Sequence, residues 1–187
     1  MYSYKTTPYK HQKEIFEDSW NTRHYALFLE MGTGKSNIAI DSLAALYEAR
    51  SINTVLVVAP KGVFANWVEK ESPKHLPNRI PHKIVQWQSN ITKKFREALT
   101  ELADPKHKDL HILVMNVEAL STMKGASSAF KFLKMNPNNL FVMDESTAIK
   151  NRKALRTKNA IKAASMAKYK RILTGSPITK NPMDLFS

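Results

Sequence analysis

One stretch of the chain restricts the possible folds more than any other: the eight residues LEMGTGKS at positions 29–36. Residues 25–29 are apolar and have the length of a buried strand. Residues 37–49 repeat apolar side chains at the spacing of a helix. A strand, a glycine-rich loop, a Lys-Ser pair and a helix together form the context of a phosphate-binding loop.

The chemistry of such a loop follows from its small residues and from the helix behind it. Glycines let the backbone curl so that successive N–H groups point at one anion, and the helix adds free N–H groups and the positive end of its dipole. The predicted phosphate-binding residues are Met31, Gly32, Thr33, Gly34, Lys35 and Ser36. Lys35 is expected to reach the outer phosphates, and the Ser36 hydroxyl to hold Mg²⁺. The full pattern begins with glycine where this chain has Leu29, so a tight turn with an exposed lysine is the alternative.

Apolar runs alternate with helical patterns along the rest of the chain. The expected strands are residues 25–29, 54–59, 83–87, 109–115, 140–143 and 169–173, and the expected helices are 9–20, 37–49, 62–71, 92–103, 126–135 and 152–168. The third helix should stop near Pro73. This alternation predicts an α/β fold, a parallel sheet flanked by helices on both faces. Ligands of such sheets bind at the carboxyl ends of the strands.

Length and composition favour one soluble domain over residues 1–187. No stretch approaches the roughly 20 apolar residues of a membrane span, and the N-terminus lacks the apolar core of a signal peptide. The absence of cysteine excludes disulfides and thiolate-bound zinc and fits a reducing compartment. We therefore expect a cytoplasmic or other intracellular location, such as the nucleoid or a virus-infected host cytoplasm, and no membrane partner.

The charge balance is strongly basic. The chain has 29 Lys and Arg residues against 16 Asp and Glu residues, a net charge of +13. An excess of this size favours a polyanionic partner, with nucleic acid as the first candidate. A well-solvated basic surface is the alternative.

An acidic pair, Asp144-Glu145, directly follows the apolar run 140–143. An aspartate at a strand end can hold the Mg²⁺ that bridges the outer phosphates of a nucleotide. The next carboxylate can orient or deprotonate an attacking water. We assign Asp144 to the metal and Glu145 to the water; the alternative is an acidic pair that only caps the next segment.

Several short segments occur in a fixed order along the chain. They are PYKHQ (8–12), EMGTGKS (30–36), VAPK (58–61) with NW (66–67), NVEAL (116–120), DESTAIKN (144–151) and LTGSPI (173–178). In residues and in order these segments resemble the first motor lobe of superfamily-two helicases, most closely the Swi/Snf-like DNA translocases. The resemblance spans essentially the whole chain. That branch has DEMGLGKT at the loop and also lacks the initial glycine, which answers most of the doubt about Leu29.

The resemblance implies a RecA-like P-loop NTPase lobe that uses ATP and Mg²⁺ and moves on double-stranded DNA. Gln12 would read the edge of adenine, and Lys35, Asp144 and Glu145 would be catalytic. The residues expected to face DNA or to relay to it are Pro60, Lys61, Asn116, Lys150, Thr174, Gly175 and Ser176. Two residues depart from the family: Thr147 replaces a histidine that would bridge to the Thr-Gly-Ser segment, and Ala148 replaces a common arginine. A threonine hydroxyl can still form a hydrogen bond there, but it cannot titrate.

The resemblance also implies a second RecA-like lobe that supplies arginine fingers to the transferring phosphate. Such a finger contributes about 10³- to 10⁵-fold in rate in GTPases. None of the arginines of this chain stands in a matching motif, so we expect the 187 residues alone to bind nucleotide weakly and to hydrolyse it slowly.

Two other functions remain open at this point. A stand-alone P-loop phosphotransferase would turn over fully without DNA. A non-catalytic nucleic-acid-binding module would depend on its basic surface alone. The basic run from Lys150 to Lys162 fits a contact with duplex phosphates or a solvated helix face equally well.

Overall fold

A single six-stranded sheet organises the part of the chain that the computed structural model describes, residues 2–175. Every pair of neighbouring strands is parallel, in the order β1-β6-β5-β2-β4-β3. The strands are β1 (His24–Phe28), β2 (Thr54–Ala59), β3 (His82–Gln86), β4 (Leu110–Asn116), β5 (Asn139–Asp144) and β6 (Tyr169–Thr174). The expected α/β class is confirmed.

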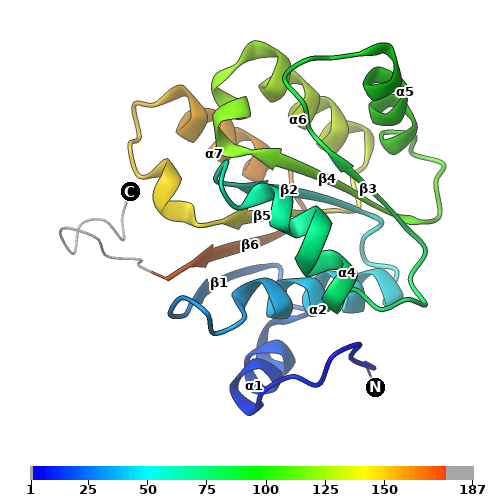
Figure 1. Cartoon of the computed structure of the whole chain (residues 1–187), viewed down its shortest axis with the longest axis vertical. Coiled ribbons are helices and arrows are strands. Elements are labelled where there is room, and N and C mark those ends of the chain that lie inside the picture. The colour runs from blue at the N-terminus through cyan, green and yellow to red at the C-terminus, as the bar shows by residue number, and fades with distance from the viewer. Residues whose placement is uncertain (1, 176–187) are drawn as a thin grey trace.

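Helices cover both faces of the sheet (Figure 1). Their bounds are α1 (Lys10–Ser19), α2 (Lys35–Glu48), α3 (Phe64–Asn66), α4 (Ser72–His75), α5 (Lys93–Leu102), α6 (Met123–Met135) and α7 (Leu155–Ser165). One apolar core joins the sheet to α1, α2 and the π-helix that contains Trp67, and a second joins it to α5, α6 and α7. Strands β2 and β5 are buried along their whole length, which explains their uninterrupted apolar sequences.

The segment after β2 differs most from the expectation. A helix was predicted to stop near Pro73, whereas the chain passes from α3 through a π-helix, η1 (Trp67–Glu71), into α4 and ends at His75. Pro73 occupies the first turn of α4, where its missing N–H is not needed. The π-turn shifts the helical register and so separates the two helical pieces.

The bounds of two other helices, α6 and α7, also differ from the prediction. Helix α6 begins at Met123, three residues earlier than predicted, because the Thr122 hydroxyl caps it by accepting from Gly125 N–H at 3.0 Å. Helix α7 is shorter than predicted at both ends. Two 3₁₀ turns, η2 (Val117–Ser121) and η3 (Ser146–Ile149), follow β4 and β5 directly.

A buried arginine fastens α1 to the sheet. The side chain of Arg171, on β6, is fully buried, and one guanidinium nitrogen donates to the carbonyls of Ser19 and Trp20 at 2.9 Å each. These carbonyls belong to the last turn of α1, which has no intrahelical partners for them. Burial lowers the pKa of Arg171 to about 10. Within the described residues, no helix is long and apolar enough to cross a membrane.

Candidate nucleotide-binding site

The glycine-rich loop connects β1 to α2 at the carboxyl edge of the sheet. Gly32 and Gly34 both adopt left-handed backbone angles, with φ of 79° and 86°. A Cβ at Gly34 would lie 2.2 Å from Nε2 of Gln12, whereas one at Gly32 would meet nothing within 4 Å. Gly34 is therefore required by its conformation and by a close neighbour, and Gly32 by its conformation alone.

Gln12 fixes the loop from the side of α1. Its Nε2 donates to the Thr33 carbonyl at 2.9 Å, and its Oε1 accepts from the Tyr9 N–H at 3.0 Å. Asn37 Nδ2 also donates to this Oε1 at 3.3 Å, while Asn37 Oδ1 is buried and has no hydrogen-bond partner among the described residues. The expected adenine reader thus lies directly against the loop.

Lys35 folds back over its own loop. Its ammonium donates to the carbonyls of Leu29 and Glu30 at 2.9 Å each. Both acceptors are neutral carbonyls, which bind an ammonium less strongly than a charged oxygen does. An anion in the loop would therefore compete for this ammonium on favourable terms.

Asp144 ends β5 and is almost fully buried. The indole N–H of Trp67, from the π-helix, donates to its Oδ2 at 2.8 Å. Burial raises the pKa of Asp144, and the Trp67 hydrogen bond and the nearby charge of Lys35 act in the opposite direction. The Leu29 N–H donates to the Thr174 carbonyl at 3.2 Å, so the start of the glycine-rich loop lies beside the end of β6, the strand that pairs with β5.

Glu145 adopts a left-handed conformation, with φ 52° and ψ 68°. A residue with a side chain rarely adopts this conformation, and it occurs preferentially at functional sites. Two hydroxyls hold its Oε1: Thr147 donates at 3.0 Å and Thr174 at 2.8 Å. The carboxylate of Glu145 therefore links the acidic segment to the end of β6, where the family histidine was expected to form the bridge.

A cavity of about 560 Å³ lies above the loop. Its lining includes five residues predicted from the sequence, namely Gln12, Gly32, Gly34, Lys35 and Ser36. It also includes residues that the sequence did not single out for the site: Thr6, Thr7, Asn37, Glu71, Lys74 and His75. The side chain of Met31 is exposed and is not part of this lining.

Three of the cavity residues that the sequence did not single out, Thr6, Glu71 and His75, contact one another. The Thr6 hydroxyl lies 2.7 Å from His75 Nδ1, and His75 Nε2 lies 3.8 Å from a carboxylate oxygen of Glu71. Burial raises the pKa of Glu71 and lowers that of His75. No local pattern identifies these residues, because they come from the N-terminal segment and from the end of the π-helix. Trp67 could be found only as a member of the NW pair.

The residues present fit a nucleotide with Mg²⁺. The two left-handed glycines form a cradle that a side chain would fill, and the unpartnered oxygen of Asn37 offers an acceptor on the cavity wall. A hydroxyl and a carboxylate are the hard oxygen ligands that Mg²⁺ prefers, and it retains several waters. Within the described residues no three His, Asp or Glu side chains could hold a metal together, so a Mg²⁺ ion here would need ligands from the nucleotide and from water.

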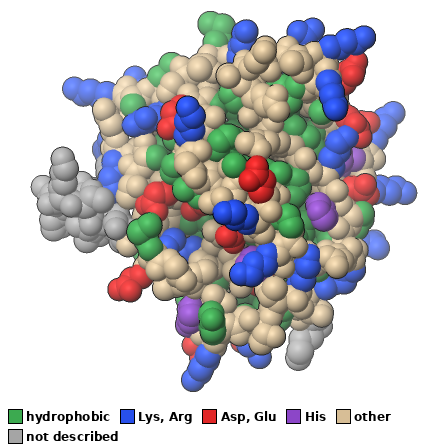
Figure 2. All heavy atoms as spheres, viewed as in Figure 1, with side chains coloured by type: hydrophobic (Ala, Val, Ile, Leu, Met, Phe, Trp, Pro, Cys, Tyr) green, Lys and Arg blue, Asp and Glu red, His purple; other side chains and the backbone are tan. Residues whose placement is uncertain are grey.

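The residues expected on the DNA side stand at neighbouring strand ends. Lys61 is exposed after β2; Asn116 ends β4, and its Oδ1 accepts from the Ala119 N–H at 2.8 Å, which caps η2. Thr174 points to Glu145, and Gly175 lies against the glycine-rich loop, since a Cβ on it would be 3.2 Å from Met31 Cγ. Pro60 and Lys150 are half-buried, and Ser176 lies outside the described residues. Figure 2 shows Lys and Arg side chains all around this view of the surface and fewer Asp and Glu side chains.

The parallel sheet with this loop at its edge is the fold of a RecA-like helicase lobe. The family model of the SNF2-related domain matches residues 15–187, and the chain belongs to this family. Curated relatives include the chromatin remodeling factor mit1 of Schizosaccharomyces pombe, 26% identical over 169 residues, and the chromatin-remodeling ATPase INO80 of Emericella nidulans, 29% identical over 165 residues. These alignments cover 90% and 84% of this chain but only 11% and 9% of the relatives, so the chain spans about a tenth of their length.

Two solved structures share the fold. The Sulfolobus solfataricus SWI2/SNF2 ATPase core in complex with dsDNA aligns with 98% of this chain and 35% of that chain, at a TM-score of 0.67 and 21% identity. The UvsW helicase from bacteriophage T4 aligns with 97% of this chain and 57% of that chain, at a TM-score of 0.65 and 14% identity.

Proposed function

We propose that this chain is the ATP-binding lobe of a motor that couples ATP hydrolysis to movement on double-stranded DNA. The proposal is supported above all by contacts between the loop that carries Lys35 and the segment that carries Asp144 and Glu145. The Leu29 N–H donates to the Thr174 carbonyl at 3.2 Å, and the Thr174 hydroxyl donates to Glu145 Oε1 at 2.8 Å. Lys35 and the acidic pair are more than a hundred positions apart in the sequence. Membership of the SNF2-related family and the relatives named as ATPases and helicases agree with it.

ATP would lie along the cavity with its phosphates in the loop. The ammonium of Lys35 would exchange the carbonyls of Leu29 and Glu30 for the outer phosphate oxygens. Gln12 would turn part of its amide to the adenine edge while it remains close to Thr33. Ser36 and Asp144 would hold Mg²⁺, which when bound neutralises charge on the outer phosphates.

Glu145 is proposed to orient the attacking water. Because Thr147 and Thr174 both donate to its Oε1, the carboxylate is fixed in direction before the nucleotide arrives. A fixed acceptor reduces the entropy that is lost when the attacking water becomes ordered. Thr174 also ends the strand whose loop is proposed to relay to DNA, so its hydroxyl would connect the two sites.

Duplex DNA is proposed to lie across the strand ends that carry Lys61, Asn116 and Lys150. Contacts from these side chains to phosphates would set position without reading sequence. A second RecA-like lobe would supply the arginine fingers. This places most of the catalytic rate outside the 187 residues, so slow hydrolysis by them alone is expected.

The test is a titration of fluorescent ATP·Mg²⁺ with and without duplex DNA. Lys35→Ala is expected to weaken nucleotide binding about tenfold or more, since one charge-assisted contact contributes about 1.5–3 kcal/mol. Lys10→Ala, an exposed lysine on α1, is the matched control and should leave binding unchanged. DNA binding that survives Lys35→Ala with no measurable nucleotide affinity in either protein would instead identify a nucleic-acid-binding module. Full turnover by the 187 residues without DNA would identify a stand-alone phosphotransferase.

A further inference from the structure

Helices α6 and α7 leave a groove open on the outer surface of the molecule. The two helices follow parallel strands and therefore run in the same direction. Between them lies a hollow of about 680 Å³, lined by residues of both helices and by Thr122 just before α6. This face lies on the opposite side of the sheet from α2, so it is separate from the nucleotide cavity (Figure 1).

The two walls of the groove carry the same spacing. On α6 the lining residues Met123, Ser127, Phe130 and Lys134 follow one another at intervals of four, three and four. On the other wall Leu155, Asn159 and Lys162 of α7 and Met166, the residue just after it, do the same. This is the a/d spacing with which a helix presents one stripe to a partner helix. Each wall spans about three helical turns.

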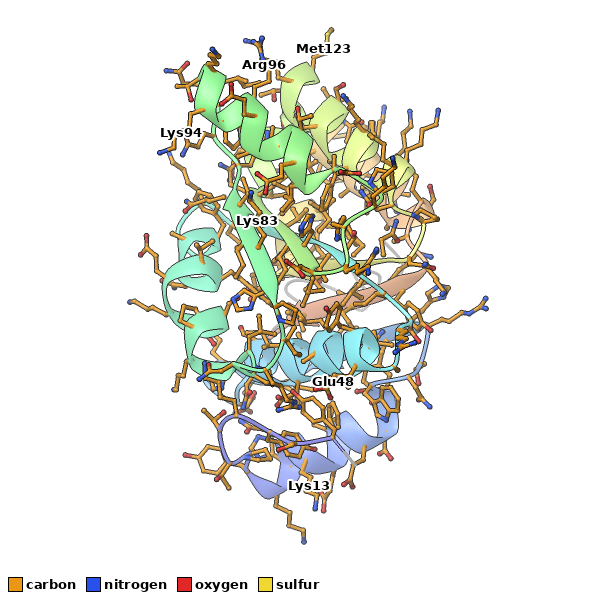
Figure 3. The ribbon with its side chains drawn as sticks, turned by 90° about the vertical axis from the view of Figure 1, so that its right-hand side faces the viewer. Lys13, Glu48, Lys83, Lys94, Arg96 and Met123 are labelled. Atoms are coloured by element: carbon orange, nitrogen blue, oxygen red, sulfur yellow. The ribbon has the colours of Figure 1, made fainter. Side chains whose placement is uncertain are left out.

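The stripes leave large apolar side chains in solvent. Met123 is 89% exposed and Leu155 is 55% exposed. Figure 3 shows Met123 projecting away from the end of α6. Exposed apolar side chains aligned along a groove mark an interaction site more often than scattered ones do.

The basic charge of the groove indicates that its partner is acidic. Neither α6 nor α7 contains an acidic residue, and Lys131, Lys134 and Lys162 line the hollow. The ammonium of Lys162, on α7, lies 4.8 Å from the centre of the Phe130 ring on α6. A partner that covers the apolar stripe must bring carboxylates to these three ammonium groups.

We infer that the α6/α7 groove is a docking site for an acidic amphipathic helix of another protein segment. Such a helix would lay an apolar stripe of about three turns between the two walls and place Asp or Glu side chains beside Lys134 and Lys162. A protein helix is favoured over nucleic acid because phosphates gain nothing from Met123, Leu155 and Phe130. The inference does not depend on the proposed motor activity.

The experiment uses the 187-residue chain and a synthetic probe, a fluorescein-labelled peptide of about 18 residues with Leu at the a and d positions and Glu and Gln elsewhere. Fluorescence anisotropy is expected to show saturable binding. The same peptide with Lys in place of Glu is expected to bind at least about tenfold more weakly, because it would face three lysines.

A neutral double variant, Met123→Ser with Leu155→Ser, tests the apolar stripe. Both side chains are exposed, so the fold should be kept, and peptide binding should weaken about tenfold or more. Ile161→Ser is the matched control: Ile161 is 58% exposed on α7 but does not line the groove, and its replacement should change the affinity less than about twofold.

Three results would overturn the inference. The first is no saturable peptide binding, or equal weakening by Ile161→Ser. The second is competition between a labelled DNA duplex and the peptide, together with a loss of duplex affinity in the double serine variant as large as the loss of peptide affinity. That result would make the groove a nucleic-acid surface. The third is self-association of the wild-type chain in sedimentation equilibrium that the double variant abolishes, which would make a second copy the occupant.

Discussion

The hydroxyl of Thr174 donates to Oε1 of Glu145 at 2.8 Å, and this contact joins the end of β6 to the residue that follows β5. The register of the two strands makes the contact possible, because Asp144 pairs with Leu173 and the next residue of each segment, Glu145 or Thr174, therefore lies beside the other. Thr147 donates to the same oxygen from the other side at 3.0 Å. One carboxylate oxygen of Glu145 therefore accepts hydrogen bonds from both η3 and the end of β6.

A double-mutant cycle of Thr147→Val and Thr174→Val tests this shared acceptor. Each single change removes one donor and is expected to lower the free energy of unfolding by about 1 kcal/mol. The double variant should lose more than the sum, by about 0.5 kcal/mol or more, because Oε1 then has neither hydroxyl. Urea unfolding of the four proteins gives the coupling. Strictly additive losses would show that the two hydroxyls act independently.

Glycine replacements in the loop should separate backbone strain from crowding. Gly32→Ala is expected to lower the free energy of unfolding by about 1–2 kcal/mol through its left-handed angle alone. Gly34→Ala carries the same strain and also displaces the amide of Gln12, so its loss should be larger and nucleotide binding should fall with it. Calorimetry and a nucleotide titration measure the two effects.

Gly62→Ala is the control for this pair. Gly62 has no left-handed angle, and a Cβ there would meet nothing within 4 Å, so stability should change by less than about 0.5 kcal/mol. Equal losses for Gly32→Ala and Gly34→Ala would mean that Gln12 moves aside without effect on the loop.

The sequence predicts those parts of the molecule that depend on neighbouring residues. The apolar run of β2 and the glycines before α2 are local signals, and the strand and the loop occur where they were expected. The fold class followed from alternation alone. The strand order could not be derived in this way, because it depends on which crossovers pass over which strands.

The parts of the site that the sequence did not predict are contacts between residues far apart in the chain. Trp67 reaches Asp144 over 77 positions, and Thr6 reaches His75 over 69. The apolar spacing of a helix or a strand reports only on residues a few positions apart, so it cannot reveal contacts between residues this far apart in the sequence. The π-helix that aims Trp67 also escaped prediction, since apolar spacing around Pro73 cannot distinguish a shifted register from a helix end. The family resemblance included the NW pair but did not predict the contact of Trp67 with Asp144.

Replacing Trp67 by Phe should show how much its hydrogen bond lowers the pKa of Asp144. The change removes the indole donor but retains a ring, so the pKa of Asp144 should rise further, because the hydrogen bond acts against the effect of burial. A buried carboxylate that loses a donor should lower the free energy of unfolding by about 1.5–3 kcal/mol at neutral pH. Carboxyl NMR titration and urea unfolding provide the measurements.

Trp87→Phe is the matched control. Trp87 is as deeply buried, but its indole N–H has no hydrogen-bond partner among the described residues. Its replacement therefore removes packing alone and should leave the pKa of Asp144 unchanged. A similar loss of stability in both variants, with no shift at Asp144, would contradict the role of the Trp67 bond.

The pair Asp41 and Tyr2 should make the stability of the chain depend on pH. Tyr2 donates to Asp41 Oδ1 at 2.8 Å, and burial raises the pKa of Asp41 from 3.8 to about 6, although this hydrogen bond acts to lower it. Between these two values the folded chain binds more protons than the unfolded chain, so stability should fall as the pH rises from about 4 to about 6 and then remain level.

Asp41→Asn keeps an acceptor for Tyr2 and cannot ionise. It should be more stable than wild type by on the order of 2 kcal/mol at pH 7.5 and nearly equal at pH 4. Asp18→Asn, at an exposed position of α1, should show no such difference in urea unfolding. Parallel pH profiles for wild type and Asp41→Asn would exclude Asp41 as the group responsible, because only its ionisation distinguishes the two proteins.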